Sequence, residues 1–224
     1  ALSMGETTVT GDLSLKTMSV DITQVGPITV GGRTDIVAAG NVILADVGNN
    51  FVGTLNVDTG GALELTTSGA LTIGNAVTVG NTVLKSTGKL DLGTSVFGGT
   101  LKANSGGFEI MQSGPVSFGG NTDFDAGTAK IDLFDPKNFW KGSIVYKGGI
   151  VMINHPQLLN ATNAGTLIVR VETSMQVVSI AKTVVPVTAT TVNEPAQPSG
   201  LGKGADVSVS QQRIATPAQS GLVT

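Results

Sequence analysis

Between residues 11 and 153 the chain is a succession of short segments in which one polar residue separates two apolar ones, such as Leu63-Glu64-Leu65 and Leu90-Asp91-Leu92. A period of two places both apolar side chains on one face of a β-strand and the polar side chain on the other. Successive segments start 6 to 8 residues apart over most of this stretch, so only 3 to 5 residues connect them. No window of helical period is long enough to compete, and we predict an all-β fold.

The connections favour a parallel solenoid over a meander of hairpins. They consist of Gly, Asn, Thr and Ser, and few carry the Asn-Gly or Asp-Gly pairs typical of two-residue hairpin turns. Three short strands and three bends close a coil of roughly 20 residues, and stacked coils bury their apolar residues in columns. The residues predicted to be buried are Leu71, Ile73, Val77, Val79, Leu90, Leu92, Phe108, Ile110, Val116, Phe118, Ile131 and Leu133. Those predicted to point outward are Glu64, Thr72, Lys102, Glu109 and Asp132.

An internal repeat supports this prediction. The stretch from Ile110 to Gly127 resembles residues 22–40, and Gly26-Pro27 recurs as Gly114-Pro115, 88 residues later. Residues 46–53 recur as residues 135–142 after a slip of one residue. The repeat corresponds to about four coils, and about seven coils are expected in all. Asparagines are expected at equivalent bends, where they bind the coils above and below: Asn41, Asn49, Asn75, Asn81, Asn104 and Asn121.

Composition narrows the class of protein. Charged residues make up 13% of the 224 residues, the net charge is −3 and no basic stripe is present, so nucleic acid is not an expected partner. The chain has no cysteine, which excludes disulfides and thiolate chemistry. No apolar run approaches the roughly 18 residues that a membrane helix needs. If the protein is exported, we expect that its signal peptide has been removed.

Three regions follow from changes along the chain. Residues 1–157 form the predicted parallel β-helix with its two repeats of about 88 residues. Residues 158–192 form a β-rich extension, in which longer β-branched runs, such as 166–172 and 175–180, have no counterpart in the repeat. Residues 193–224 form a tail rich in Pro, Gly, Ser and Gln.

The repeat also carries a family resemblance. The sequence from Gln112-Ser113-Gly114-Pro115 to Gly127, followed by residues 131–139, resembles the repeats of filamentous-haemagglutinin-like exoproteins of the bacterial two-partner-secretion type. The resemblance covers roughly residues 10–150 and implies a right-handed parallel β-helix. It also implies export through an outer-membrane transporter and an adhesive role at the cell surface. The chain is far shorter than a whole exoprotein of that kind, and no amino-terminal secretion domain is identifiable in it.

Carboxylates are the main candidates for chemistry. Asp123 and Asp125 flank inward Phe124 and share the outer face of one strand, with Asp132 and Asp135 following. Such a pair could serve glycoside hydrolysis or bind Ca²⁺, but a solvated outer face is the commoner arrangement. Asp123 corresponds to Asp35 in the first repeat, whereas Asp125 corresponds to Val37, so the pair is not a repeat feature. We predict no catalytic, cofactor-binding or metal-binding residue, and no cofactor.

The remaining polar and aromatic candidates are isolated. His155 is the only histidine, and without cysteine or a second histidine it is expected to be a turn residue. Trp140 in Phe139-Trp140 could contact sugars or a partner, but the aligned Phe51 favours a position in the core. Asn160 begins a glycosylation-type triplet, which arises often by chance.

These observations favour a non-enzymatic, extracellular structural or adhesive protein of the bacterial surface. The expected partners are other copies of the chain, joined by strand addition through residues 166–192, and glycans or proteins of host or cell surfaces. The alternative to strand addition is that these residues cap their own coils. The alternative function is a carbohydrate-active β-helix that binds or cleaves polysaccharides, which would need a cleft lined by Asp or Glu together with Lys or Arg.

Overall fold

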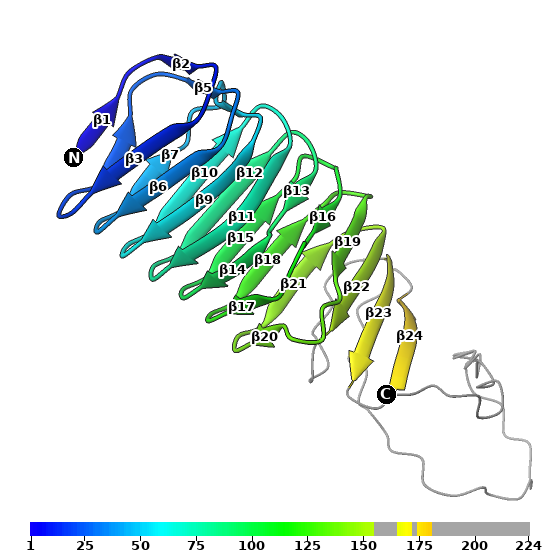
Figure 1. The fold of residues 1–224 in the computed structure, drawn as a ribbon. Coiled ribbons are helices and arrows are strands. Elements are labelled where there is room, and N and C mark those ends of the chain that lie inside the picture. Colours follow the sequence, from blue (N-terminus) through cyan, green and yellow to red (C-terminus); the bar gives the residue numbers. More distant parts are fainter. Residues whose placement is uncertain (155–164, 172–173, 181–224) are drawn as a thin grey trace, which may run out of the picture. The chain divides into compact units, whose positions relative to one another are not determined.

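The structure, a computed structural model, describes residues 1–154, 165–171 and 174–180, the last two ranges by their backbone. Residues 1–154 form a parallel β-solenoid of about seven turns, with all their regular structure in strands (Figure 1). Within these described residues, no helix is long and apolar enough to cross a membrane. The predicted all-β parallel solenoid is therefore confirmed.

Each coil passes in chain order through three faces. The first face is an eight-stranded parallel sheet: β1 (Leu2–Met4), β4 (Ile22–Gln24), β7 (Val42–Leu44), β10 (Leu63–Thr67), β12 (Thr82–Ser86), β15 (Leu101–Asn104), β18 (Thr122–Asp125) and β21 (Ile144–Lys147). The second face holds β2 (Thr7–Val9), β5 (Ile28–Val30) and β8 (Asn50–Phe51), and continues after a break in β13 (Leu90–Asp91), β16 (Ile110–Met111), β19 (Lys130–Leu133) and β22 (Ile150–Asn154).

The third face consists of β3 (Leu13–Thr17), β6 (Thr34–Ala38), β9 (Thr54–Thr59), β14 (Thr94–Phe97), β17 (Val116–Phe118) and β20 (Phe139–Trp140). Strand β11 (Leu71–Thr78) joins two faces, because its start pairs with β13 and its later part with β14. Paired residues on the first face lie one coil apart. Their separation in the sequence, which is the length of the coil, ranges from 19 residues for Thr82↔Leu101 to 22 residues for Thr122↔Ile144. The predicted coil of about 20 residues is confirmed.

The interior is an apolar column on each face. Nine of the twelve residues predicted to be buried are at most 1% exposed: Leu71, Ile73, Leu90, Leu92, Ile110, Val116, Phe118, Ile131 and Leu133. The alternating polar residues face outward, with Thr72 and Lys102 exposed and Glu64, Glu109 and Asp132 half-buried. Local alternation was therefore sufficient to predict most of the core.

Three predictions of burial were wrong, and each has a local cause. The register between β9 and β11 slips at Gly74, which inverts the alternation, so Ala76 and Thr78 point inward and Val77 is 39% exposed. Val79 follows the end of β11 and lies on the corner, 67% exposed. Phe108 is 52% exposed because the turn before β16 uses Gly106 and Gly107 at positive φ and the strand begins only at Ile110.

The repeat spans four coils plus one face, rather than four whole coils. Ile22 begins β4 on the first face, whereas Ile110, 88 residues later, begins β16 on the second face. The same shift takes β6 on the third face to β18 on the first. Because the coil has three comparable faces, the same sequence folds equally well after a rotation by one face.

Each repeat encloses one pair of side-chain amides at a corner. Asn49, which is fully buried, exchanges two hydrogen bonds of 2.9 Å with Gln24 of the preceding coil, accepts one from the Ile28 N–H and donates one to the Leu44 carbonyl. The second repeat reproduces this arrangement with Asn138, Gln112, the Val116 N–H and the Leu133 carbonyl. We call these two arrangements the amide clasps. Each supplies hydrogen bonds to backbone groups next to the corner.

Asparagines also link coils at the corner between the third and first faces. Side-chain oxygens of Asn41, Asn81 and Asn121 accept hydrogen bonds from backbone N–H groups one coil further on, at 2.8 to 3.0 Å. The predicted bonding between coils is therefore confirmed at these three positions. Asn49 also bonds to the preceding coil, through its clasp. At Asn75 the backbone N–H donates to the Asn56 side chain of the preceding coil, and Asn104 accepts from the Gly106 N–H of its own turn.

The predicted extension contains two described strands. β23 (Gly165–Val171) pairs in parallel with β22, and β24 (Ser174–Ile180) returns antiparallel to β23 (Figure 1). This pairing within one chain is the arrangement expected if the extension covers its own coils. His155, Asn160 and residues 181–224 lie outside the described residues.

Candidate functional site

The paired carboxylates lie in a shallow groove on the first face. Asp123 and Asp125 project outward from β18, and the groove continues over β15 and β12 past Lys102 and Lys85. It encloses about 240 Å³, below the roughly 300–1,000 Å³ typical of ligand pockets. The groove thus combines carboxylates and cations on one face, which is the arrangement that a carbohydrate-active site would need.

The other two carboxylates are not part of this groove. Asp132 projects from β19 on the second face, and Asp135 accepts a hydrogen bond from the Lys137 N–H in a turn. Within the groove, Asp125 is engaged by the Lys147 ammonium at 3.5 Å and by the Gly127 N–H at 2.9 Å. Asp123 is exposed and makes no hydrogen bond or ion pair with the described residues. Of the four predicted carboxylates, therefore, the structure brings together only the first two.

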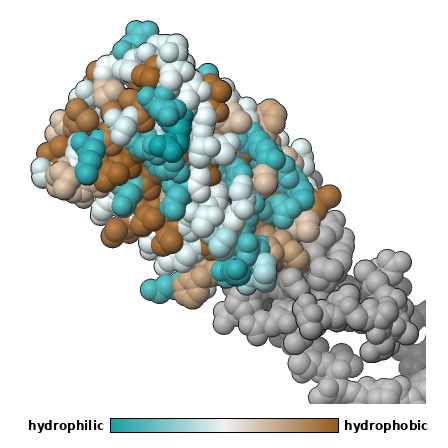
Figure 2. All heavy atoms as spheres, in the orientation of Figure 1, coloured by the Kyte–Doolittle hydropathy of each residue, from teal (hydrophilic) through white to brown (hydrophobic). Residues whose placement is uncertain are grey.

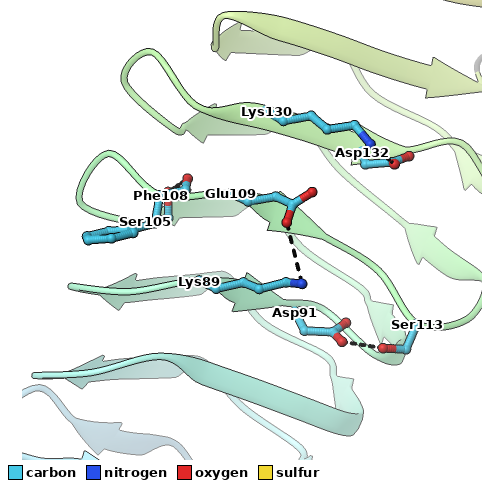
Figure 3. Close-up of polar contacts among 8 residues, drawn as sticks. All are labelled: Lys89, Asp91, Ser105, Phe108, Glu109, Ser113, Lys130 and Asp132. Carbon is cyan, nitrogen blue, oxygen red and sulfur yellow. Dashed lines mark hydrogen bonds and ion pairs between the residues drawn. The ribbon is translucent and has the colours of Figure 1, made fainter.

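The second face carries a ladder of opposite charges across three coils (Figure 3). Lys89 lies 3.4 Å from Glu109 one coil further on, and Lys130 in the next coil lies 2.5 Å from Asp132 of its own strand. The hydrogen bond to Asp132 raises the pKa of Lys130 against the opposing effect of desolvation. Asp91 accepts a hydrogen bond from the Ser113 hydroxyl beside this ladder.

Such a ladder contributes little stability, since exposed ion pairs are worth roughly 0–1 kcal/mol. Its charges alternate in sign and are paired with one another, so the ladder does not present a field of one sign to an ionic ligand. Among the described residues, no group of three or more His, Cys, Asp or Glu side chains could hold a metal ion.

Trp140 belongs to the core, as the aligned Phe51 predicted. It is 8% exposed, its indole Nε1 donates a 2.7 Å hydrogen bond to the Asn154 carbonyl, and its ring stacks on Phe118 at 4.0 Å between centroids. A sugar could not reach this ring without displacing the last coil. The neighbouring Phe139 has the opposite orientation and is 57% exposed.

The third face has the most apolar outer surface of the three. Its outward column runs, in register from one coil to the next, through Lys16, Val37, Asp58, Val77, Val96, Ser117 and Phe139. The four apolar members are 39–57% exposed. A groove of about 260 Å³ lies at the middle of the face, lined in part by Val77, Val96 and Pro115. Figure 2 shows one side of the molecule, on which hydrophobic and hydrophilic surface alternate.

Sequence reasoning missed two features of these surfaces. The outward column on the third face was hidden because the slip at Gly74 makes Val77 an outward residue. The amide clasps were hidden because their partners are 25 and 26 residues apart. A signal was nevertheless present, since both the glutamine and the asparagine recur in the two repeats.

Comparison with known proteins gives one family. The family described as "Repeats of unknown function (DUF5649)" matches residues 1–58 and 79–146. No curated protein and no solved structure matches the chain. The two matched segments cover more than half of the 224 residues and coincide with the coils that carry the internal repeat. This chain therefore belongs to the DUF5649 family of repeats and adopts a parallel β-solenoid.

Proposed function

We propose that the protein is a non-enzymatic structural or adhesive component of a bacterial surface, exported to the cell exterior. The proposal rests on where the side chains lie. Over residues 1–154 apolar residues fill the interior, and outward side chains, both polar and apolar, form columns with one residue per coil. A stack of this kind presents regularly spaced side chains on a stiff support, which suits contact with surface glycans or proteins better than conversion of a small substrate.

The resemblance to filamentous-haemagglutinin-like exoproteins supports the same proposal and adds passage through an outer-membrane transporter. The test is to express the intact gene in its native host and to locate the protein by protease treatment of whole cells. We expect rapid loss of the protein in intact cells and protection of a cytoplasmic marker. A protein that resists protease until the cells are lysed would refute the proposed location.

We further propose that copies join end to end. In the part of the chain that the structure describes, β1, β2 and β3 each pair on one side only, and so does β24. Unpaired strand edges recruit other strands, and a head-to-tail contact need not close. Electron microscopy of the purified protein should show filaments, which deletion of residues 166–224 should abolish. Deletion of residues 193–224 alone is the control and should preserve them. Filaments that survive the longer deletion would refute the role of the extension.

One observation favours a second function. The groove over β12, β15 and β18 places Asp123 and Asp125 beside Lys85 and Lys102, as a polysaccharide-binding or polysaccharide-cleaving protein would require. The test is the double variant Asp123→Asn, Asp125→Asn, assayed for sugar release from acidic and neutral polysaccharides against a Glu64→Gln control on the same face. On the leading proposal, no turnover is expected from either protein. Turnover that the double variant loses and the control keeps would establish the second function.

A further inference from the structure

We infer that the groove on the third face is a binding site for an acidic sugar, meaning a carboxylate-bearing residue at the end of a surface glycan. The inference rests on the proposed contact with surface glycans and deepens it, because it names the place on the molecule and the chemical class of the ligand. Its test uses purified protein, so it can fail while the proposed location at the cell exterior holds.

The groove runs along the coil axis between two outward columns of the third face. One wall belongs to the outward column described above and contains Val77, Val96 and Ser117. The other wall is formed two residues earlier in each coil, by Asn75, Thr94, Pro115 and Lys137. Four coils about 4.8 Å apart give the groove a length of roughly 14 Å, which suits a short oligosaccharide.

The neutral polar side chains of this groove are free to bind a ligand. The Asn75 amide and the hydroxyls of Thr94 and Ser117 make no hydrogen bond with the part of the chain that the structure describes. The coil before the groove differs, because the Asn56 amide donates to Asp35 and its oxygen accepts from the Asn75 N–H. Free amide and hydroxyl groups around one groove match a ligand that is rich in hydroxyl groups.

Apolar surface lies between these polar groups. Val77 and Val96 are 39% and 47% exposed, and Pro115 lies beside them in the groove. The slip at Gly74 creates this surface, because it turns Val77 outward and in register with Val96. A mostly apolar lining with a few polar groups is typical of small-molecule sites. A sugar ring has the matching character, since its C–H groups can pack on the valines while its hydroxyls bind the polar wall.

The charge of the groove lies at one end and is positive. Lys137 is the charged residue of the lining, and its ammonium forms no ion pair with the described residues. Asp135, two residues earlier, accepts a hydrogen bond from the Lys137 N–H instead. Asp58 lies at the other end, in register with Val77. A ligand with one carboxylate fits this distribution, whereas a polyanion would bring negative charge close to Asp58.

The groove on the first face does not match an acidic ligand. Asp123 and Asp125 line it together with Lys102, and Asp125 already engages Lys147 at 3.5 Å. Its two carboxylates would repel the carboxylate of the sugar. Lys102 is exposed, as is Lys137, so it supplies a matched control for Lys137 and also tests the competing groove.

An NMR titration of the full chain with sialyllactose, and with lactose as its neutral counterpart, tests the inference. We expect a dissociation constant for sialyllactose in the millimolar range, because the groove is shallow and open. Amide shifts should be confined to β11, β14, β17 and residues 135–139. Lactose should bind at least about tenfold more weakly, because it cannot form the charge-assisted hydrogen bond to Lys137.

Three variants assign the binding to this groove. Lys137→Met should weaken sialyllactose binding at least about tenfold, whereas Lys102→Met should leave it unchanged. Thr94→Val keeps the shape of the side chain and removes the hydroxyl, so it should weaken binding about threefold to tenfold. Equal binding of the two sugars, or no binding of sialyllactose at tens of millimolar, would overturn the inference. So would loss of binding in Lys102→Met with Lys137→Met unaffected.

Discussion

Replacing Asn49 by alanine tests whether the amide clasps hold the coils together. The Asn49 side chain is fully buried. It accepts a hydrogen bond from the Ile28 N–H and donates one to the Leu44 carbonyl, and both Ile28 and Leu44 are 0% exposed. Truncation removes both hydrogen bonds from buried backbone groups, at roughly 1–3 kcal/mol each. The half-buried Gln24 amide can form hydrogen bonds with water instead. We therefore expect Asn49→Ala to lower the free energy of unfolding by about 2–5 kcal/mol.

The second clasp supplies an internal comparison. Asn138 makes the same set of contacts but is half-buried, so water can replace part of what is lost. Asn138→Ala should therefore lower stability by only about 1–2 kcal/mol. Asn104→Ala, at an exposed residue that accepts a single hydrogen bond within its own turn, is the control and should have the smallest effect.

Urea unfolding measures the global change, and amide hydrogen exchange measures the local one, which matters because stacked coils need not unfold in one step. Exchange of the Ile28 N–H should accelerate by at least about 30-fold in Asn49→Ala, since each 1.4 kcal/mol corresponds to tenfold. Stability of Asn49→Ala equal to that of Asn104→Ala, with unchanged exchange at Ile28, would refute a structural role for the clasp.

Four further predictions concern single positions. Thr34→Val should raise stability by up to about 1–2 kcal/mol in thermal unfolding, because the buried Thr34 hydroxyl has no hydrogen-bond partner among the described residues; a loss of stability would contradict this. Leu92→Ala should lower stability by about 2–5 kcal/mol, because the residue is fully buried in the column; a near-neutral effect in urea would argue against a packed interior. Gly93→Ala should destabilise strongly, because φ is +61° and the new Cβ would lie 2.1 Å from the Ile73 carbonyl oxygen; wild-type melting would contradict this. Burial raises the pKa of Tyr146 to about 12. The folded state therefore holds a proton that the unfolded state releases above pH 10, and stability should fall between about pH 10 and 12. Tyr146→Phe should flatten that fall in alkaline titration, and an unchanged slope would assign it to another group.

Most of the fold follows from local information, because a period of two decides which side chains point inward. Leu90 and Leu92 are examples, since each is buried by its own strand's alternation regardless of what lies in the next coil. Val77 shows the limit of this reasoning. A single-residue slip at Gly74 reverses the alternation, and only the register with β9 reveals it.

The surfaces were less predictable than the core, because they depend on which coils become neighbours. Asp123 and Asp125 were expected together because they share one strand, and they are together. The cations beside them, Lys102 and Lys85, come from the two preceding coils. Their position therefore depends on the length of each coil, which the sequence predicts only to within about one residue. The outward column of the third face depends on the same register.

The repeat of four coils plus one face determines the directions in which the protein presents its surface. Asp35 on the third face and Asp123 on the first occupy the same position of the repeating unit. Successive units thus follow a screw, turning by about 120° each time they advance, and a fourth unit would return to the starting side after about 13 coils. A longer chain built by duplicating this unit would present equivalent patches all around its axis. Such an array could engage partners from any direction, whereas a repeat of whole coils would present one side only.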